Sequence, residues 1–179
     1  LAVQLVTRIN DALVVNPVNL LALALRDAPR RAMDAGQLVH QIDVLRRLLV
    51  EVPHSERQAI TPMDGREVVA YAERQHVAHR IAHPLGDIIE TSERTAILLG
   101  YFASNVLHAY VLPALLATVV ARNERVEPLR LAAIARNLLP FLQTEWYLSG
   151  DADVLQARLQ RFVEAFFRIG LARSTGAFM

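Results

Sequence analysis

Three histidines and one aspartate in a single stretch have the side chains of a metal site. They form the pattern H-x2-H-x3-H-x3-D at His76, His79, His83 and Asp87. Imidazole and carboxylate groups are ordinary ligands of zinc and iron, and on a helix these spacings would align all four side chains. Pro84 and Gly86 disfavour a continuous helix there. We therefore predict a polar loop with solvated or backbone-bonded histidines and no metal site, with metal binding as the alternative.

Asn105 and His108 are the strongly polar side chains in the middle of an otherwise apolar run. The run extends from Thr95 to Ala121 and contains no Asp, Glu or Arg. Buried polar groups need hydrogen-bond partners, so we predict that both residues are structural members of a polar core. A catalytic role for His108 is the alternative. The sequence predicts no catalytic residue in this chain.

The apolar run itself must lie inside a protein or in a membrane. A spanning helix needs about 20 consecutive apolar residues, but polar and small residues recur along this run, and Pro113 removes a backbone donor. The charges at its two ends show no positive-inside asymmetry. We predict a buried helix or helix pair, bent near His108 to Pro113, and keep membrane insertion as the alternative.

Composition restricts the classes of function. The chain has 179 residues, enough for one sizeable domain, and a hydrophobic fraction of 53% predicts apolar surface that faces a partner domain or a membrane. The net charge of +1 is too small to predict nucleic-acid binding. All 19 basic residues are Arg. The pairs Arg30–Arg31 and Arg46–Arg47 are predicted on solvated helix faces, with anionic lipid headgroups as the alternative contact.

The sequence also lacks several local signatures of chemistry. It has no Cys, which excludes thiol catalysis, disulfides and Cys-based zinc sites. It has no glycine-rich phosphate loop and no G-x-S-x-G nucleophile turn. We predict no cofactor.

Capping residues and hydrophobic spacing predict helix after helix. Helix starts are predicted at Asn16-Pro17, at Asp34, at Thr61-Pro62 and at Thr91 or Ser92. Apolar stripes at helical spacing run through residues 38–52, 131–142 and 155–169, the second interrupted by Pro140. The helical pattern fails only between residues 76 and 90, and nothing else has the pattern of a sheet. We predict an all-α, multi-helix domain with a kinked central apolar helix and a short irregular or extended insert near 76–90.

Five blocks of the chain follow one another in a specific order. They are NPVNLLALAL (16–25), LRRLLVEVPHSER (45–57), HPLGDIIE (83–90), YFASNVLHAYVLPALL (101–116) and LLPFLQTEWYL (138–148). In order and spacing, from about Val6 to Leu171, they resemble the C-terminal part of the bacterial membrane-bound glycerol-3-phosphate acyltransferases. Members of that family transfer a fatty acyl group from acyl-CoA or acyl-carrier protein to position 1 of sn-glycerol-3-phosphate, the first step of phospholipid synthesis.

The family's catalytic motifs are absent from this chain. The family's general base is a His followed, after four residues, by an Asp, and no His here is followed by Asp at that position. The aromatic-x-Glu-Gly-x-Arg phosphate motif is also missing. Both motifs lie upstream in the family. The resemblance therefore implies that residues 1–28 are the tail end of the acyltransferase core or connecting helices, and that residues 29–179 are a helical C-terminal domain.

The resemblance also implies a role and partners. The chain would support the catalytic domain and membrane docking, as a peripheral part of an enzyme on the cytoplasmic side of the bacterial inner membrane. Its partners would be the upstream acyltransferase domain of the same protein, acyl-CoA or acyl-carrier protein through that domain, and an anionic membrane surface. Because the chain begins at Leu1, we expect a fragment of a longer polypeptide or a chain whose beginning was removed. The alternative is a non-catalytic helical module that binds an apolar ligand or partner helix near Tyr101–Leu116.

Overall fold

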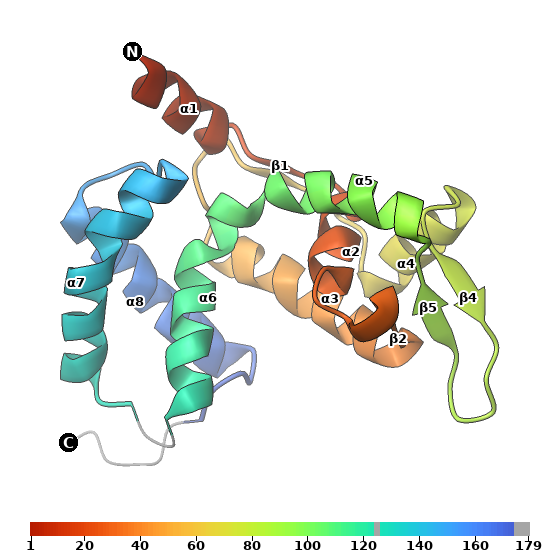
Figure 1. Cartoon of the computed structure of the whole chain (residues 1–179). Coiled ribbons are helices and arrows are strands. Elements are labelled where there is room, and N and C mark those ends of the chain that lie inside the picture. The colour runs from red at the N-terminus through yellow and green to blue at the C-terminus, as the bar shows by residue number, and fades with distance from the viewer. Residues whose placement is uncertain (124–125, 174–179) are drawn as a thin grey trace. The chain divides into compact units, whose positions relative to one another are not determined.

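Helices dominate the structure, a computed structural model that describes residues 1–123 and 126–173. Within these residues it contains eight α-helices and five strands of two or three residues each. The predicted multi-helix, mostly all-α fold is therefore confirmed. The chain divides into two compact units (Figure 1): unit 1 comprises residues 1–13, 48–57 and 108 onward, and unit 2 comprises residues 14–47 and 58–107. The predicted domain boundary between residues 28 and 29 stays a prediction.

Unit 2 is built around α2. Its helices are α2 (Pro17–Leu25), most of α3 (Ala35–Glu51), α4 (Gly65–Arg74) and α5 (Glu93–Ser104). Helix α2 packs against both α4 and α5. The buried side chain of Asn19 on α2 donates from Nδ2 to the carbonyl oxygen of Phe102 on α5, at 2.8 Å. This hydrogen bond joins two helices that are far apart in the sequence.

Two small sheets complete unit 2. They are formed by β1 (Val14–Val15), β2 (Ala32–Asp34), β3 (Ala59–Ile60), β4 (His79–Ile81) and β5 (Ile88–Glu90), with a 3-10 turn at η1 (Pro29–Arg31). Strand β5 lies between β2 and β4 and is antiparallel to both, whereas β1 and β3 are parallel. The extended pieces predicted between residues 76 and 90 are β4 and β5. The prediction that nothing else forms sheet is wrong, because β1, β2 and β3 also belong to the sheets. These strands are too short to show an alternating pattern in the sequence.

Most of the predicted helix starts are confirmed by capping hydrogen bonds. The side-chain oxygens of Asn16, Asp34 and Ser92 each accept from a backbone N–H three residues further on. The start at Thr61-Pro62 is wrong. The Thr61 N–H donates to the carbonyl of Val15 beside the β1–β3 pair, and α4 begins only after Asp64, which caps it.

The apolar run is divided between two helices. Helix α5 ends at Ser104 and α6 (Leu107–Arg122) begins two residues after Asn105. The predicted bend near His108 to Pro113 is therefore misplaced, since Pro113 lies inside α6. A proline removes one N–H donor and thus one helical hydrogen bond, and here α6 continues past that loss.

Burial of the run is also less complete than predicted. The α5 side chains of Ile97, Leu98 and Tyr101 are 77%, 49% and 65% exposed. On α6, by contrast, a face that includes Leu112 and Leu116 is buried. No single helix in the described residues is long and apolar enough to cross a membrane, and α5 and α6 reach that length only as a pair with a break between them.

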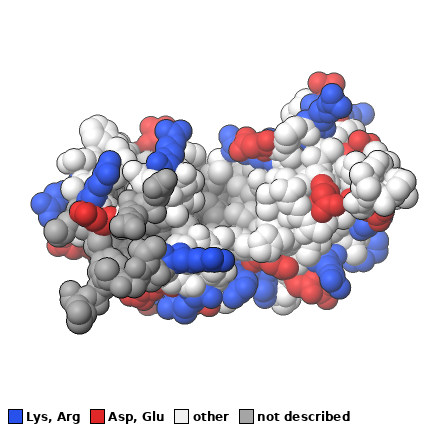
Figure 2. Space-filling view, turned by 90° about the horizontal axis from the view of Figure 1, so that it is seen from below, with Lys and Arg blue, Asp and Glu red and all other residues white. Residues whose placement is uncertain are grey.

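Unit 1 contains α1 (Ala2–Asp11), α6, α7 (Pro128–Trp146) and α8 (Ala152–Arg168), together with the end of α3. Helices α7 and α8 pack against each other (Figure 1). Buried residues of these two helices include Ala135, Leu139, Leu155, Phe162 and Phe166. Helix α7 continues through Pro140 and ends at Trp146, and the next residue, Tyr147, has a left-handed φ of 50°. On the face seen in Figure 2, basic and acidic side chains are interspersed among uncharged ones.

Gly65, the first residue of α4, allows a close approach of α3. A Cβ at position 65 would lie 2.4 Å from the carbonyl oxygen of Val39, which is backbone and cannot turn aside. We expect Gly65→Ala to lower the free energy of unfolding by about 1–3 kcal/mol, as overpacking does. Urea titration measures this change. Gly100→Ala is the control, because no atom lies within 4 Å of its added Cβ and alanine favours helix. Equal stability of both variants would contradict the expectation.

Candidate functional site

The residues of the predicted histidine loop do not converge. His76 follows α4 with a left-handed φ of 56°, His79 lies on β4, and the ring of His83 accepts a hydrogen bond from the Leu85 N–H. Asp87 instead pairs with the guanidinium of Arg80, at 3.1 Å. Among the described residues, no group of three or more His, Asp or Glu side chains is placed to hold a metal ion.

The structure separates the two polar residues of the apolar run. Asn105 is exposed at the C-terminus of α5, where its backbone N–H bonds to the carbonyl of Tyr101. His108 is only 8% exposed on the first turn of α6. The expectation of burial thus holds for His108 and fails for Asn105, because the chain turns at Asn105 instead of continuing as helix.

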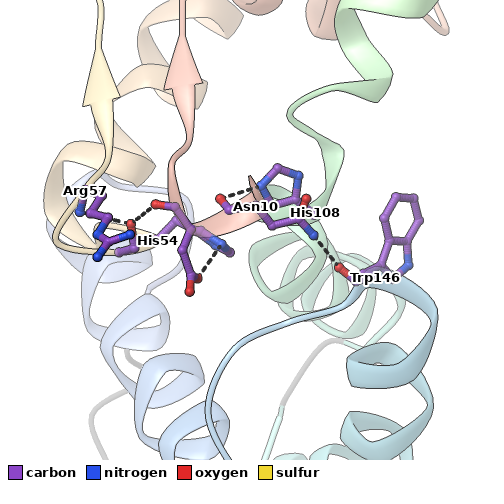
Figure 3. Close-up of polar contacts among 7 residues, drawn as sticks. Asn10, His54, Arg57, His108 and Trp146 are labelled. Atoms are coloured by element: carbon purple, nitrogen blue, oxygen red, sulfur yellow. Dashed lines mark hydrogen bonds and ion pairs between the residues drawn. The ribbon is translucent and has the colours of Figure 1, made fainter. Parts of the chain in front are cut away.

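His108 belongs to a polar cluster at the end of α1 (Figure 3). Its Nε2 lies 3.2 Å from the carbonyl oxygen of Asn10, so the ring must carry its proton on Nε2 to donate. The Asn10 side chain in turn donates from Nδ2 to the carbonyl oxygen of Trp146, at 3.0 Å. One residue of α1 therefore connects α6 with the end of α7.

His54 completes the cluster from the segment after α3. Its ring meets that of His108 edge to face, with centroids 4.9 Å apart, and it is 3% exposed. Burial lowers the pKa of His54 to about 4, and the nearby His108 and Arg158 act in the same direction. Burial lowers the pKa of His108 as well, against the hydrogen bond to Asn10. Both rings are therefore neutral at physiological pH.

Asp11 and Ser55 hold the segment around His54 in place. Asp11 Oδ1 lies 4.0 Å from His54 Nε2. The Ser55 hydroxyl donates to the backbone carbonyl of Asp11 and accepts from the N–H of Arg57, at 3.1 Å for the second bond. The Ser55 bonds therefore order the backbone that follows α3. That His108 is a structural member of a polar core stays a prediction.

Sequence reasoning singled out one member of this cluster, His108. Asn10, Asp11 and His54 carry no local motif, and Asn10 lies 98 residues from His108 and 136 from Trp146. Only the tertiary fold brings them together. The available signal is indirect: His54 falls in the block LRRLLVEVPHSER, which carries a family resemblance but no local signature of chemistry.

Comparison with known proteins places this helical fold in one family. The family described as the glycerol-3-phosphate acyltransferase C-terminal region matches residues 1–177, and the chain belongs to it. A glycerol-3-phosphate acyltransferase of Xanthomonas campestris pv. campestris is 40% identical over 171 residues, 96% of this chain and 19% of the relative. The protein of the same name from Xylella fastidiosa is 39% identical over 176 residues, 98% of this chain and 20% of the relative.

More distant relatives agree with this assignment. A glycerol-3-phosphate acyltransferase of Pseudomonas paraeruginosa is 35% identical over 173 residues, 97% of this chain and 21% of the relative. The chain thus spans about a fifth of the length of the curated relatives it matches. No solved structure matches the chain.

The buried histidines make stability depend on pH. His54 binds a proton near pH 6.5 in the unfolded chain but only near pH 4 in the folded one, so the unfolded state binds more protons as the pH falls. We expect the contribution of the neutral His54 ring to the free energy of unfolding to be complete above pH 6.5. The free energy of unfolding should then decrease by about 3 kcal/mol toward pH 4. Urea titrations across this range measure the loss.

Two variants separate His54 from other titrating groups. His54→Gln removes the titrating ring and should flatten the pH dependence between 6.5 and 4. His40→Gln changes an exposed histidine on α3 and should keep the slope of the parent chain. An unchanged slope in His54→Gln would show that the buried ring is not the cause.

Proposed function

We propose that this chain is the helical C-terminal region of a longer glycerol-3-phosphate acyltransferase. The whole protein would transfer an acyl group from acyl-CoA or acyl-carrier protein to sn-glycerol-3-phosphate, which yields 1-acyl-glycerol-3-phosphate for phospholipid synthesis. One observation carries the proposal: relatives with that name align with 96–98% of this chain. The chain's part is to support an upstream catalytic domain of the same protein.

The acyl transfer itself takes place outside this chain in the proposal. General-base catalysis needs a base within hydrogen-bond reach of the attacking hydroxyl. His54 and His108 are buried, and Nε2 of His108 is engaged by the Asn10 carbonyl. The chain also has no His followed after four residues by Asp. These features support a structural role for both histidines.

Two exposed apolar faces support docking of the upstream domain. Helix α1 has no buried residue, and its exposed apolar side chains are Leu1, Val3, Leu5 and Ile9. Helix α5 exposes Ile97, Leu98 and Tyr101. Exposed apolar surface of this kind marks interaction sites. We assign these faces to the catalytic domain, through which acyl-CoA or acyl-carrier protein would be reached.

We also propose that the whole protein works on the cytoplasmic side of the bacterial inner membrane as a peripheral protein. The acylated product is a lipid, so its release is easiest at a bilayer. Arginine supplies every basic side chain of this chain, and guanidinium groups bind phosphate oxygens well. An anionic membrane surface is therefore a fitting partner.

We expect the 179-residue chain to lack acyltransferase activity when purified alone. The measurement is glycerol-3-phosphate-dependent release of CoA from palmitoyl-CoA. The full-length protein is the positive control. Adding the isolated chain to the full-length protein should not raise the activity above that of the full-length protein alone. Release of CoA by the isolated chain would overturn this division of labour. An inactive full-length protein would instead favour the alternative of a helical binding module.

Replacing His108 should affect stability rather than the chemical step. His108→Leu removes the donor to the Asn10 carbonyl, which should cost about 1–3 kcal/mol. We expect a lower melting temperature of the full-length protein, with near-normal turnover by the molecules that remain folded. His79→Leu, at an exposed position on β4, is the control. Unchanged melting with abolished turnover at saturating substrate would place His108 in the active site.

A further inference from the structure

Unit 1 contains a hollow of about 660 Å³ beside the polar cluster. Its lining includes three arginines and two serines: Arg8, Arg57, Arg158, Ser55 and Ser149. The carboxylates of Asp11 and Glu56 and the neutral ring of His54 also line it. Three positive charges against two negative ones leave the hollow net positive.

Two arginines outside the hollow make close ion pairs. Arg80 pairs with Glu73, and Arg168 pairs with Glu51, at 2.8 and 3.0 Å. Among the described residues, no carboxylate lies within ion-pairing distance of the guanidinium groups of the hollow. Arg158 is also partly buried, and this burial lowers its pKa despite the nearby Asp11. A desolvated cation without a direct counter-ion favours an anion from outside.

Three different elements position these groups, and local hydrogen bonds order one of them. Arg8 projects from α1 and Arg158 from α8. The Arg57 segment is tied by Ser55, whose hydroxyl bonds to the carbonyl of Asp11 and to the Arg57 N–H (Figure 3). Ser149 sits in the turn before α8, next to Gly150, whose φ of 94° favours glycine. Donor residues from three elements of the chain thus line one hollow.

We propose that this hollow binds a phosphate monoester through Arg8, Arg57 and Arg158, with the hydroxyl of Ser149 as a further donor, because the Ser55 hydroxyl already donates to the carbonyl of Asp11. Guanidinium forks match phosphate oxygens in geometry and keep their charge at all physiological pH values. The hollow is larger than a phosphate group, so it leaves room for a small organic part. The proposal stands on the lining residues alone and does not need the proposed acyl-transfer function.

The test is calorimetric titration of the full 179-residue chain, near neutral pH and at low salt, with inorganic phosphate, sn-glycerol 3-phosphate and glycerol. We expect saturable binding of the two phosphates and none of glycerol. Arg158→Gln and Arg57→Gln should each weaken binding at least about tenfold. Arg130→Gln, on exposed α7 surface outside the hollow, should bind as the parent chain does. Circular dichroism melting checks that each variant is folded, and Arg57, being exposed, can change without loss of core.

The outcomes separate the sources of the phosphate. Tighter binding of sn-glycerol 3-phosphate than of inorganic phosphate supports a small-molecule site that uses the organic part. Equal binding of sn-glycerol 3-phosphate and inorganic phosphate supports a site that contacts only the phosphate group. Binding only to vesicles that contain phosphatidic acid, with no binding of either free phosphate, would overturn the proposal in favour of a lipid surface. Equal weakening by Arg130→Gln, or no saturable binding, would also overturn it.

Discussion

The polar cluster of unit 1 depends on one constraint, that the last carbonyl groups of a helix have no partner within the helix. Asn10 lies in the last turn of α1, and its carbonyl oxygen accepts from His108 Nε2. Trp146 is the last residue of α7, and its carbonyl accepts from the Asn10 side chain. One carbonyl at each of these helix ends is thereby satisfied by a side chain. A buried carbonyl without a donor would cost roughly 1–3 kcal/mol, so these two bonds decide how α1, α6 and α7 can meet.

In unit 2, a helix-end carbonyl likewise accepts a hydrogen bond from an asparagine side chain, that of Asn19. At the end of α5 the chain tightens, and the N–H of Val106 bonds to Ala103 instead of to Phe102 four residues back. The Phe102 carbonyl is then available, and the buried Asn19 side chain donates to it. The break in the apolar run is thus coupled to a residue on α2. The same physical requirement explains why asparagine, with a side-chain donor on a short stem, occurs at both junctions.

This requirement also explains how far the sequence could predict the structure. Helix caps at Asn16 and Ser92 were predictable, because cap and N–H are three residues apart. The place of the break was not, since the Asn19 donor lies 83 residues from the carbonyl it satisfies. Pro113 was the stronger local signal for a bend, yet the packed helix continues past it. In the candidate site, the burial of His108 followed from its apolar neighbours, whereas its partner on α1 left no trace in the local sequence.

The polar side chains of unit 1 differ in charge and in the partners they have. Asn10, His54 and His108 are buried or partly buried, and they are uncharged at physiological pH. The side chains of Asn10 and His108 donate to backbone carbonyls, and these hydrogen bonds hold helices together. Arg158 differs because burial disfavours its charge and no carboxylate within ion-pairing distance offsets that cost among the described residues. A fold optimised for stability alone would place an acid there or a neutral side chain. Retaining a partly desolvated guanidinium beside a hollow is the kind of local conflict expected where a protein must bind an anion.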